Sequence, residues 1–508
     1  MLKASTYTDN VKQFIGWMDR LSEAVTEDYR SPLFGELTRK QVFQEYLRNV
    51  PLEGPKFSEH MSERERKEAE RILTPWSERP PWSAWGPQTV ASYYAPKDPP
   101  LNTLETATSR LKQKLGSGPG QPWPLKKAYH QLPSTTSSGL DWLVTPWKKE
   151  VGSEVLRIVE SAWANDDPID IPPSMPMWRV DPPGKVRFAW AESKIEAVAG
   201  APFVYPLIAD WREIPEFVAW KGPNYAQPMV SETLQTHPGN VLSIDYSTFD
   251  QTQSPKLIRH ACDIMHEACG YRKPNFFKSW VDNLVQGPVL TPDRELTGYH
   301  GIPSGSVATN MVDTINNMLC IEGYLDSYGI DGVYFALGDD AVIIGEGVDP
   351  VDFAEFATGD FGFVANPDKQ FFSTSKAADF LQMSYYVENG YKPTYPVSRV
   401  AWRMIGYERH RYRGKDWNEW GVVVRTLQQL QNAINNPSID KMVEWIQRDG
   451  DRLRLGADED PQEILELAGK PAKAMTEERA RWDPGAEESR PFREWEINKL
   501  VRRLARRR

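Results

Sequence analysis

Hydrophobic and polar positions divide the chain into regions of different periodicity. Residues 1–75 have the pattern of polar helices, and the run at 61–73 carries dense charge of both signs, typical of a solvated helix face. Residues 100–390 mix short strand-like runs with helical patterns, and the chain becomes helical after about 390, with 422–434 as its clearest amphipathic stretch. The succession predicts a mixed central part followed by a helical C-terminal part.

The segment from about 75 to 100 is rich in Pro and Trp. Proline lacks a backbone N–H and interrupts regular structure, so the composition predicts an extended connector on the protein surface. Trp76, Trp82 and Trp85 are the side chains expected to anchor it. A proline-rich ligand for another module is the alternative interpretation.

Composition limits the function only weakly. The chain has 508 residues, of which 40% are hydrophobic and 26% charged, enough for a large core and more than one domain. A net charge of −10 argues against a general nucleic-acid binder, but it does not describe the lining of a channel. The three cysteines have no CxxC spacing, which predicts neither a zinc site nor a disulfide framework. No stretch of 18 apolar residues occurs, so no membrane partner is expected.

The first candidate site lies at residues 240–255. A short apolar run of strand type ends at Asp245, and Asp250 follows after four residues. A carboxylate at the end of a strand is held by rigid backbone, which suits a metal ligand. The alternative is that Asp250 caps the helix expected near Ser254 and that Asp245 is a turn residue.

A second acidic segment covers residues 332–345. Two apolar runs flank Gly338, Asp339 and Asp340, and this pattern predicts a β-hairpin with a tight turn. Two adjacent acids between buried strands require a compensating cation, for which Mg²⁺ is the natural candidate. An ordinary hairpin turn is the alternative. Two-metal phosphoryl transfer uses ions about 4 Å apart, and Asp245 with Asp339 could bridge them from two strands.

Between the acids, residues 300–319 predict a loop followed by a helix. The loop contains Pro303, Ser304 and Gly305. One stripe of the helix is apolar and faces the core. The other stripe carries short polar side chains, which suit contact with a sugar or a base better than a solvent face: Thr309, Asp313 and Asn316 or Asn317.

In this order the three segments resemble motifs A, B and C of viral RNA-dependent RNA polymerases. Four further segments resemble the remaining motifs: 182–193 motif F, 365–372 motif D, 379–386 motif E and 134–139 motif G. The resemblance spans about residues 134–386 and is greatest to the picobirnaviruses, with the partitiviruses second. It implies an α+β right-hand polymerase with fingers, palm and thumb, whose antiparallel palm sheet is flanked by helices.

The resemblance also implies roles for the acidic residues and one lysine. Asp245, Asp339 and Asp340 would bind two Mg²⁺ ions, for which Mn²⁺ could substitute. Lys369 would protonate the leaving pyrophosphate, although a plain surface lysine is equally compatible with its surroundings. Asp250 would contact the ribose 2′-hydroxyl, which distinguishes RNA from DNA.

Other residues would bind the nucleotide. In the motif F strand, Lys185 and Arg187 alternate with apolar residues and would hold the triphosphate, with an ordinary edge strand as the alternative. The implied nucleotide-binding set in the motif B segment is Ser304, Gly305, Thr309, Asn310 and Asp313. The sugar-reading Asn of the family aligns with Asp313, so either Asn310 replaces it or Asp313 binds differently. Gln382 and Met383 stand where motif E often has Lys and Arg.

The implied organisation is an N-terminal extension at 1–100 linking fingers and thumb, fingers mainly at 101–240, palm at 241–390 with a fingers insertion near 265–300, and thumb with a basic tail at 391–508. The implied function is genome replication and transcription for a double-stranded RNA virus, with primer-independent initiation. Template and product RNA, nucleoside triphosphates and a capsid protein would be the partners, inside the virion and in the host cytoplasm. The alternatives are a catalytically silent palm-fold protein, a reverse transcriptase or a nucleotide cyclase.

Overall fold

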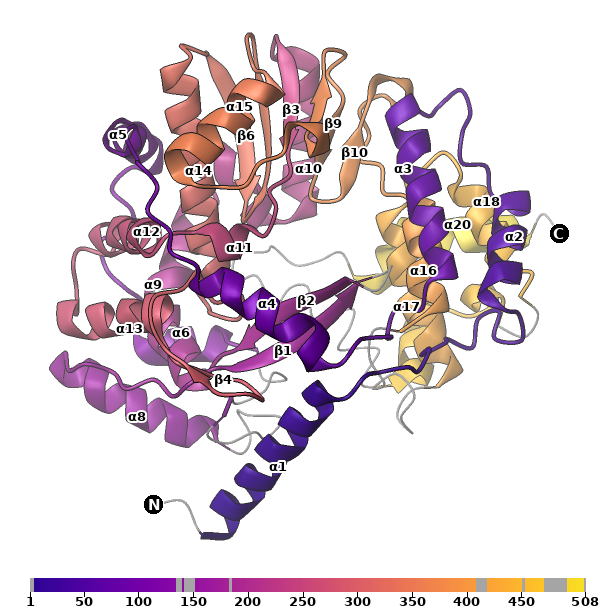
Figure 1. The fold of residues 1–508 in the computed structure, drawn as a ribbon. Helices are drawn as coiled ribbons and strands as arrows, with labels where there is room; N and C mark the ends of the chain where they lie inside the picture. The colour runs from indigo at the N-terminus through magenta and orange to yellow at the C-terminus, as the bar shows by residue number, and fades with distance from the viewer. Residues whose placement is uncertain are drawn as a thin grey trace.

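Helices surround a small antiparallel sheet in the computed structural model of the chain (Figure 1). The structure describes residues 4–133, 139–140, 151–181, 185–407, 418–449, 453–469 and 491–506. Most of the segment resembling motif G, residues 134–138, and the start of motif F, residues 182–184, lie outside this part. For Lys185 the structure describes the backbone alone. None of the described helices is long and apolar enough to cross a membrane.

The N-terminal hundred residues form four main helices: α1 (Ala4–Ser22), α2 (Arg39–Asn49), α3 (Glu59–Glu70) and α4 (Trp82–Tyr94). The prediction of an extended segment at 75–100 is therefore wrong for α4, which includes Pro87. Trp82 and Trp85 are buried as predicted, in edge contact at 5.2 Å between ring centroids. The burial of two large aromatic side chains offsets the roughly 3 kcal/mol that an internal proline costs a helix.

Helix α3 departs from the predicted solvated face. Glu65 is fully buried and accepts hydrogen bonds from the backbone N–H groups of Val397, at 2.9 Å, and Ser398, at 2.8 Å. These two residues begin α16 (Val397–Ile405), whose first N–H groups have no partner within the helix. A charged side chain from the N-terminal region thus satisfies the end of a C-terminal helix.

The next part of the chain is largely helical and carries one long hairpin. Strands β1 (Met175–Asp181) and β2 (Lys185–Ala191) pair antiparallel, with Arg179 opposite Arg187. The buried helix α9 (Lys194–Trp211) follows β2 directly. The remaining elements are α5 (Leu104–Leu115), α6 (Leu125–Gln131), α8 (Gly152–Asn165), η2 (Pro215–Lys221), α10 (Pro223–Thr236), α11 (Phe249–Thr252), α12 (Pro255–Ala268), α13 (Pro274–Gln286), β4 (Val289–Leu290) and β5 (Glu295–Leu296).

A four-stranded antiparallel sheet carries both acidic segments. Its strand order is β6-β7-β3-β8, so β3 lies in the interior of the sheet. The strands are β3 (Asn240–Ile244), β6 (Gly332–Leu337), β7 (Asp340–Gly345) and β8 (Phe371–Ser373). The long helix α14 (Thr309–Ser327) shares the largest hydrophobic cluster with one face of this sheet, and α10 shares a smaller cluster with the other. Short elements complete the region: α15 (Pro350–Phe356), η3 (Ala357–Phe361), η4 (Pro367–Lys369), β9 (Ala378–Phe380), β10 (Met383–Tyr385) and η5 (Val387–Asn389).

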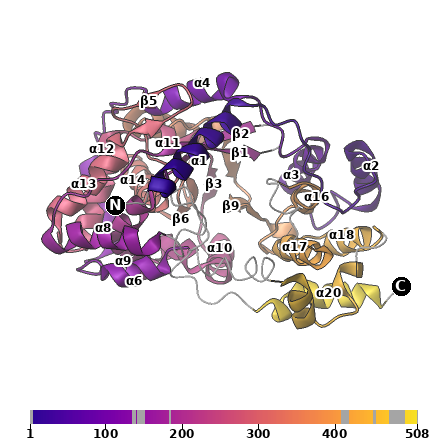
Figure 2. The same cartoon turned by 90° about the horizontal axis from the view of Figure 1, so that it is seen from below.

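The C-terminal helices form a separate hydrophobic cluster together with α2 and α3. They are α16, α17 (Glu419–Asn432), α18 (Ile439–Ile446) and α20 (Glu496–Ala505), with short turns η7 (Leu453–Gly456) and η8 (Phe492–Glu494). Figures 1 and 2 show α2 and α3 beside these helices, on the side of the molecule opposite α8, α9 and α13. In contrast, α1 and α4 share a cluster with the β1–β2 hairpin. The N-terminal segment therefore packs against both sides of the molecule.

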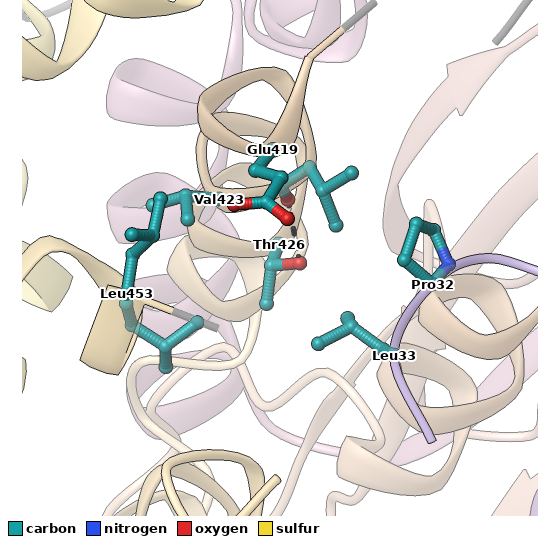
Figure 3. Close-up of a pocket in the computed structure, with 8 residues that line it drawn as sticks. Pro32, Leu33, Glu419, Val423, Thr426 and Leu453 are labelled. Atoms are coloured by element: carbon teal, nitrogen blue, oxygen red, sulfur yellow. Dashed lines mark hydrogen bonds between the residues drawn. The ribbon is translucent and has the colours of Figure 1, made fainter. Parts of the chain in front are cut away.

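A small apolar pocket lies between the N-terminal segment and α17 (Figure 3). Its lining includes Pro32, Leu33, Val423 and Leu453. The hydroxyl of Thr426 at its edge donates to the backbone carbonyl of Val422 at 2.8 Å. None of the acidic residues at the ends of β3 and β7 lines it, so this pocket belongs to the packing of the C-terminal helices.

Candidate active site

The two acidic segments meet at one end of the sheet. Strands β3 and β7 pair antiparallel with Ile244 opposite Ala341, so Asp245 leaves β3 at the end where Asp340 begins β7. Gly338 and Asp339 form the two-residue turn between β6 and β7. Gly338 has a φ of 63°, a conformation that favours glycine. The register therefore brings Asp245 and the Asp339–Asp340 turn to the same edge.

Helix α14 holds this turn in place. The Gly338 N–H donates to the hydroxyl of Thr314 at 2.8 Å, and the Asn317 side-chain amide donates to the Gly338 carbonyl at 3.0 Å. Tyr246, next to Asp245, donates its hydroxyl to Asn317 at 3.0 Å. One buried network thus connects the segments that resemble motifs A, B and C.

The polar stripe of α14 is buried rather than open to a ligand. Asn316 and Asn317 are both fully buried. Asn316 donates to the Gln253 side-chain carbonyl at 2.6 Å, and Asn317 supports the turn. The prediction that these asparagines contact a sugar or a base is therefore wrong, because their amides already bind protein groups. Asn310 lies about two turns earlier, with its side-chain oxygen 2.9 Å from the position that a Cβ on Gly338 would occupy.

The carboxyl groups of Asp250 and Asp313 affect each other's pKa. Asp250 lies in α11, and Ser254 rather than Asp250 caps α12, with its hydroxyl accepting from the Leu257 N–H at 3.2 Å. Burial and the charge of Asp339 raise the pKa of Asp250 to about 6. Burial and the charge of Asp250 raise the pKa of Asp313 well above its usual range, and Asp313 also accepts a hydrogen bond from Gln253. The hydrogen bond between the two carboxyl groups lowers the pKa of Asp250 and raises that of Asp313 further.

Asp340 is tied to the β9–β10 hairpin. Its carboxylate accepts from the Leu381 N–H at 3.1 Å. Burial and the neighbouring Asp339 raise the pKa of Asp340 to about 8. The pKa of Asp379, in the same hairpin, shifts in the opposite direction. Arg64, at 3.0 Å, and His60, at 2.8 Å, outweigh the effect of burial and lower the pKa of this carboxyl to about 2.

Two arginines from other elements contact the β9–β10 turn, which itself has Gln382 and Met383 where motif E often has Lys and Arg. Arg64 of α3 donates to the Gln382 carbonyl at 3.0 Å, and Arg399 of α16 donates to the Gln382 side-chain oxygen at 2.5 Å. Side chains from two helices therefore bring positive charge to the turn that resembles motif E.

The loop resembling motif B packs directly on β2. The Ser304 hydroxyl accepts from the Trp190 N–H at 3.3 Å. A Cβ on Gly305 would lie 1.9 Å from the Trp190 carbonyl oxygen, so only glycine fits there. The Thr309 hydroxyl donates to the Pro303 carbonyl at 2.5 Å and closes the loop. These contacts explain the residue types of the loop by its own structure, and the nucleotide-binding roles of the three residues stay predictions.

Two of the predicted cationic side chains, Arg187 and Lys369, lie on different elements. Arg187 is exposed on β2, and its charge lowers the pKa values of Asp250 and Asp339 against the effect of burial. Lys369 is exposed at the end of η4. Its neighbour Gln370, which the sequence pattern does not single out, exchanges two hydrogen bonds with the Asp245 backbone: its side-chain oxygen accepts from the N–H at 3.1 Å and its amide donates to the carbonyl at 2.9 Å.

The chemistry of the donor groups fits a hard divalent cation. Burial and mutual repulsion raise the pKa values of Asp250, Asp313 and Asp340, and burial raises that of Asp339. Carboxylate oxygens are the ligands that Mg²⁺ prefers, and a cation would relieve this repulsion. Among the described residues, no group of three or more His, Cys, Asp or Glu side chains is arranged to hold a metal ion by itself. Asp245 and Asp339 are acids that the strand register brings to the same end of the sheet, and their role as metal ligands stays a prediction.

Comparisons with known proteins agree with this geometry. The family model described as "Viral RNA-dependent RNA polymerase" matches residues 175–440, just over half of the chain. The RNA-directed RNA polymerase of Cryptosporidium parvum virus 1 (strain KSU-1) is 22% identical over 215 residues, which cover 39% of this chain and 40% of that protein. The chain thus matches less than half the length of that relative.

Solved structures show the same fold over nearly the whole chain. The crystal structure of a human picobirnavirus RNA-dependent RNA polymerase superposes with a TM-score of 0.79 at 17% identity, covering 97% of both chains. Its insertion-loop deletion mutant superposes with a TM-score of 0.77 at 17% identity, covering 100% of both. The fold is that of an α+β right-hand polymerase with fingers, palm and thumb, as the sequence predicts. With a family model that matches half its length and the motifs assembled at one edge of the sheet, the chain belongs to the family of viral RNA-dependent RNA polymerases.

Proposed function

We propose that this protein copies RNA for a double-stranded RNA virus by templated transfer of nucleotides to a growing 3′ end. The observation that carries the proposal is the register of β3 and β7, which brings Asp245 and Asp339 to one end of the sheet. The charge of Arg187 acts on Asp250 and Asp339 at that same place. This supports one site in which acidic groups would bind a cation and the Arg187 guanidinium would bind a triphosphate.

The residues of the chain would divide the reaction as follows. Lys185 and Arg187 would bind the triphosphate, with the planar guanidinium contacting two phosphate oxygens. Lys369, exposed beside the Asp245 segment, would donate a proton to the leaving pyrophosphate. Asp245 and Asp339, assisted by Asp340, would hold two Mg²⁺ ions, which when bound supply charge stabilisation for the attacking and leaving oxygens. Positioning and electrostatics would account for most of the rate.

Recognition of the sugar would involve the Asp250–Asp313 pair. Asp250 is half-buried near Asp339 and would accept a hydrogen bond from a ribose 2′-hydroxyl. Asp313 is buried and hydrogen-bonded to Asp250 and Gln253, so it would act through Asp250 rather than on the sugar. Asn310 lies beside Gly338, and its side-chain amide would be the other candidate for contact with the sugar.

The proposal extends to the biology that the family implies. Initiation would need no primer, and the protein would work inside the virion and in the host cytoplasm with a capsid protein as partner. Residues 1–100 would link fingers and thumb, which is supported by the packing of α1 and α4 on the β1–β2 hairpin and of α2 and α3 on the C-terminal helices. Residues 101–240 would be mainly fingers, 241–390 palm with a fingers insertion near 265–300, and 391–508 thumb.

The experiment that tests the proposal is primer-free incorporation of labelled ribonucleotides on a single-stranded RNA of defined sequence with Mg²⁺. We expect a product whose sequence is complementary to the template and which is not made from deoxynucleotides. A product made only from deoxynucleotides would assign the chain to reverse transcription. The absence of any product, with or without an annealed primer, would contradict the proposed activity.

A further inference from the structure

Glu196 is a fully buried carboxylate in the first turn of α9, away from the acids of the sheet. Its Oε1 accepts hydrogen bonds from the Ser306 hydroxyl at 2.6 Å and from the Trp280 indole N–H at 3.1 Å. Its Oε2 accepts from the Val307 backbone N–H at 3.3 Å. Two of the three donors thus belong to the segment directly after Ser304 and Gly305.

The loop that contains Ser304 and Gly305 is therefore held at two points. On one side it lies on β2, through the Trp190 N–H and the close approach of Gly305 to the Trp190 carbonyl. On the other side it is bound by Glu196. Because α9 begins three residues after β2 ends, the loop, the strand and the carboxylate form one closed unit.

Burial of the Glu196 carboxylate costs folding free energy unless hydrogen-bond donors replace its lost hydration. A buried carboxylate loses its hydration, and burial raises the pKa of Glu196 against the lowering effect of its hydrogen bonds. Burial together with the charge of Glu196 also raises the pKa of Glu192 well above its usual range. The three donors to Glu196 compensate for the lost water. An apolar side chain of similar size would satisfy the packing without this cost, as replacements of other buried charges show.

We propose that Glu196 is a positioning residue of the polymerase reaction, which holds the Ser304–Gly305 loop on β2 so that nucleotide and template meet the loop in the productive orientation. The inference rests on the proposed function for its kinetic consequence. Its structural part, the fixing of the loop, stands independently.

Variants of Glu196 separate these two parts. Glu196→Ala removes all three acceptor contacts, whereas Glu196→Gln keeps a carbonyl oxygen for Ser306 and Trp280. The matched control for Glu196→Ala is Glu322→Ala, because Glu322 is also fully buried and accepts from Tyr334, at 2.7 Å, and Arg110, at 2.9 Å, at the far end of α14. Differences between the Glu196 and Glu322 variants report the loop rather than the general cost of altering a buried acid.

Hydrogen exchange measured by mass spectrometry tests the structural part without any activity. We expect faster exchange of the amides in 303–308 for Glu196→Ala than for wild type, and unchanged exchange there for Glu322→Ala. Unchanged exchange in 303–308 for Glu196→Ala would overturn the inference, and this outcome does not depend on polymerase activity.

Nucleotide incorporation tests the kinetic part once wild type is shown to be active. We expect Glu196→Ala to lower kcat by about tenfold to a hundredfold, the scale of a reacting group misplaced by about 1 Å. Glu196→Gln should recover much of this loss, and Ser306→Ala should add little on the Glu196→Ala background. Equal kinetics for Glu196→Ala and Glu322→Ala would overturn the positioning role. So would effects of Glu196→Ala and Ser306→Ala on kcat that multiply independently.

Discussion

The side-chain amide of Gln370 exchanges two hydrogen bonds with the backbone of Asp245, at 3.1 and 2.9 Å. Asp245 lies just beyond the last residue of β3, where the sheet no longer fixes its backbone. Gln370, which lies 125 positions later in the chain, holds the backbone one residue beyond the end of the strand. The orientation of the Asp245 carboxylate therefore depends on a residue that need not touch the substrate.

Gln370→Ala should reduce catalysis more than stability. The loss of two hydrogen bonds costs about 1–2 kcal/mol of unfolding free energy, whereas a misplaced Asp245 should lower kcat by about tenfold or more. Denaturant unfolding and incorporation kinetics measure the two effects. Gln235→Ala is the control, because Gln235 is exposed and its amide bonds only within its own helix. Wild-type kcat in Gln370→Ala would contradict the role of this contact.

Thr314→Val should disturb the turn between β6 and β7. Valine has the shape of threonine but leaves the Gly338 N–H, now bound at 2.8 Å, without an acceptor. An unsatisfied buried group costs about 1–3 kcal/mol, and kcat should decrease as Asp339 loses its fixed position. The control is Thr426→Val, because that buried hydroxyl donates only to Val422 in its own helix. If both variants have the same kcat, the hydrogen bond to Gly338 does not position Asp339.

The pKa of Asp340, raised to about 8, predicts a pH dependence of stability. In the unfolded chain an aspartate titrates near pH 4. Between about pH 4 and 8 the folded protein thus holds a proton that the unfolded chain releases, and this group lowers the stability as the pH rises. Asp340→Asn does not titrate, so its stability relative to wild type should increase from pH 5 to pH 8, by up to about 1.4 kcal/mol per pH unit.

Asp379→Asn provides a control of opposite character. The pKa of Asp379 is lowered to about 2, so its charge stabilises the folded protein fully above about pH 4 and is lost only toward pH 2. Asp379→Asn should therefore be destabilised at every pH from 5 to 8. Urea unfolding at several pH values, with a chelator present, measures both differences. A constant difference for Asp340→Asn would contradict the raised pKa.

Local patterns were sufficient to predict the framework of the site. Short apolar runs mark β3, β6 and β7, and acids at the ends of these runs mark Asp245 and Asp339, because the signal for a buried strand lies within a few residues. The helical C-terminal part and the amphipathic stretch of α17 follow from the same kind of signal.

Contacts between distant segments were not predictable. Gln370, Thr314 and Glu196 act through partners 125, 24 and 110 positions away, and no local pattern marks such residues. The charge-rich run of α3 and the asparagines of α14 have the composition of polar faces, yet tertiary partners bury Glu65 and Asn317. A single sequence shows which residues are polar but not which polar groups meet.

The most direct test of the account is primer-free RNA synthesis with Mg²⁺ by three proteins: wild type, Asp339→Asn and Asp331→Asn. The two variants make the same chemical change near opposite ends of strand β6, and Asp331 is exposed and lies away from the turn. The account predicts template-complementary product from wild type and Asp331→Asn, and a loss on the order of a hundredfold or more for Asp339→Asn. Equal synthesis by Asp339→Asn and wild type would show that the active site lies elsewhere.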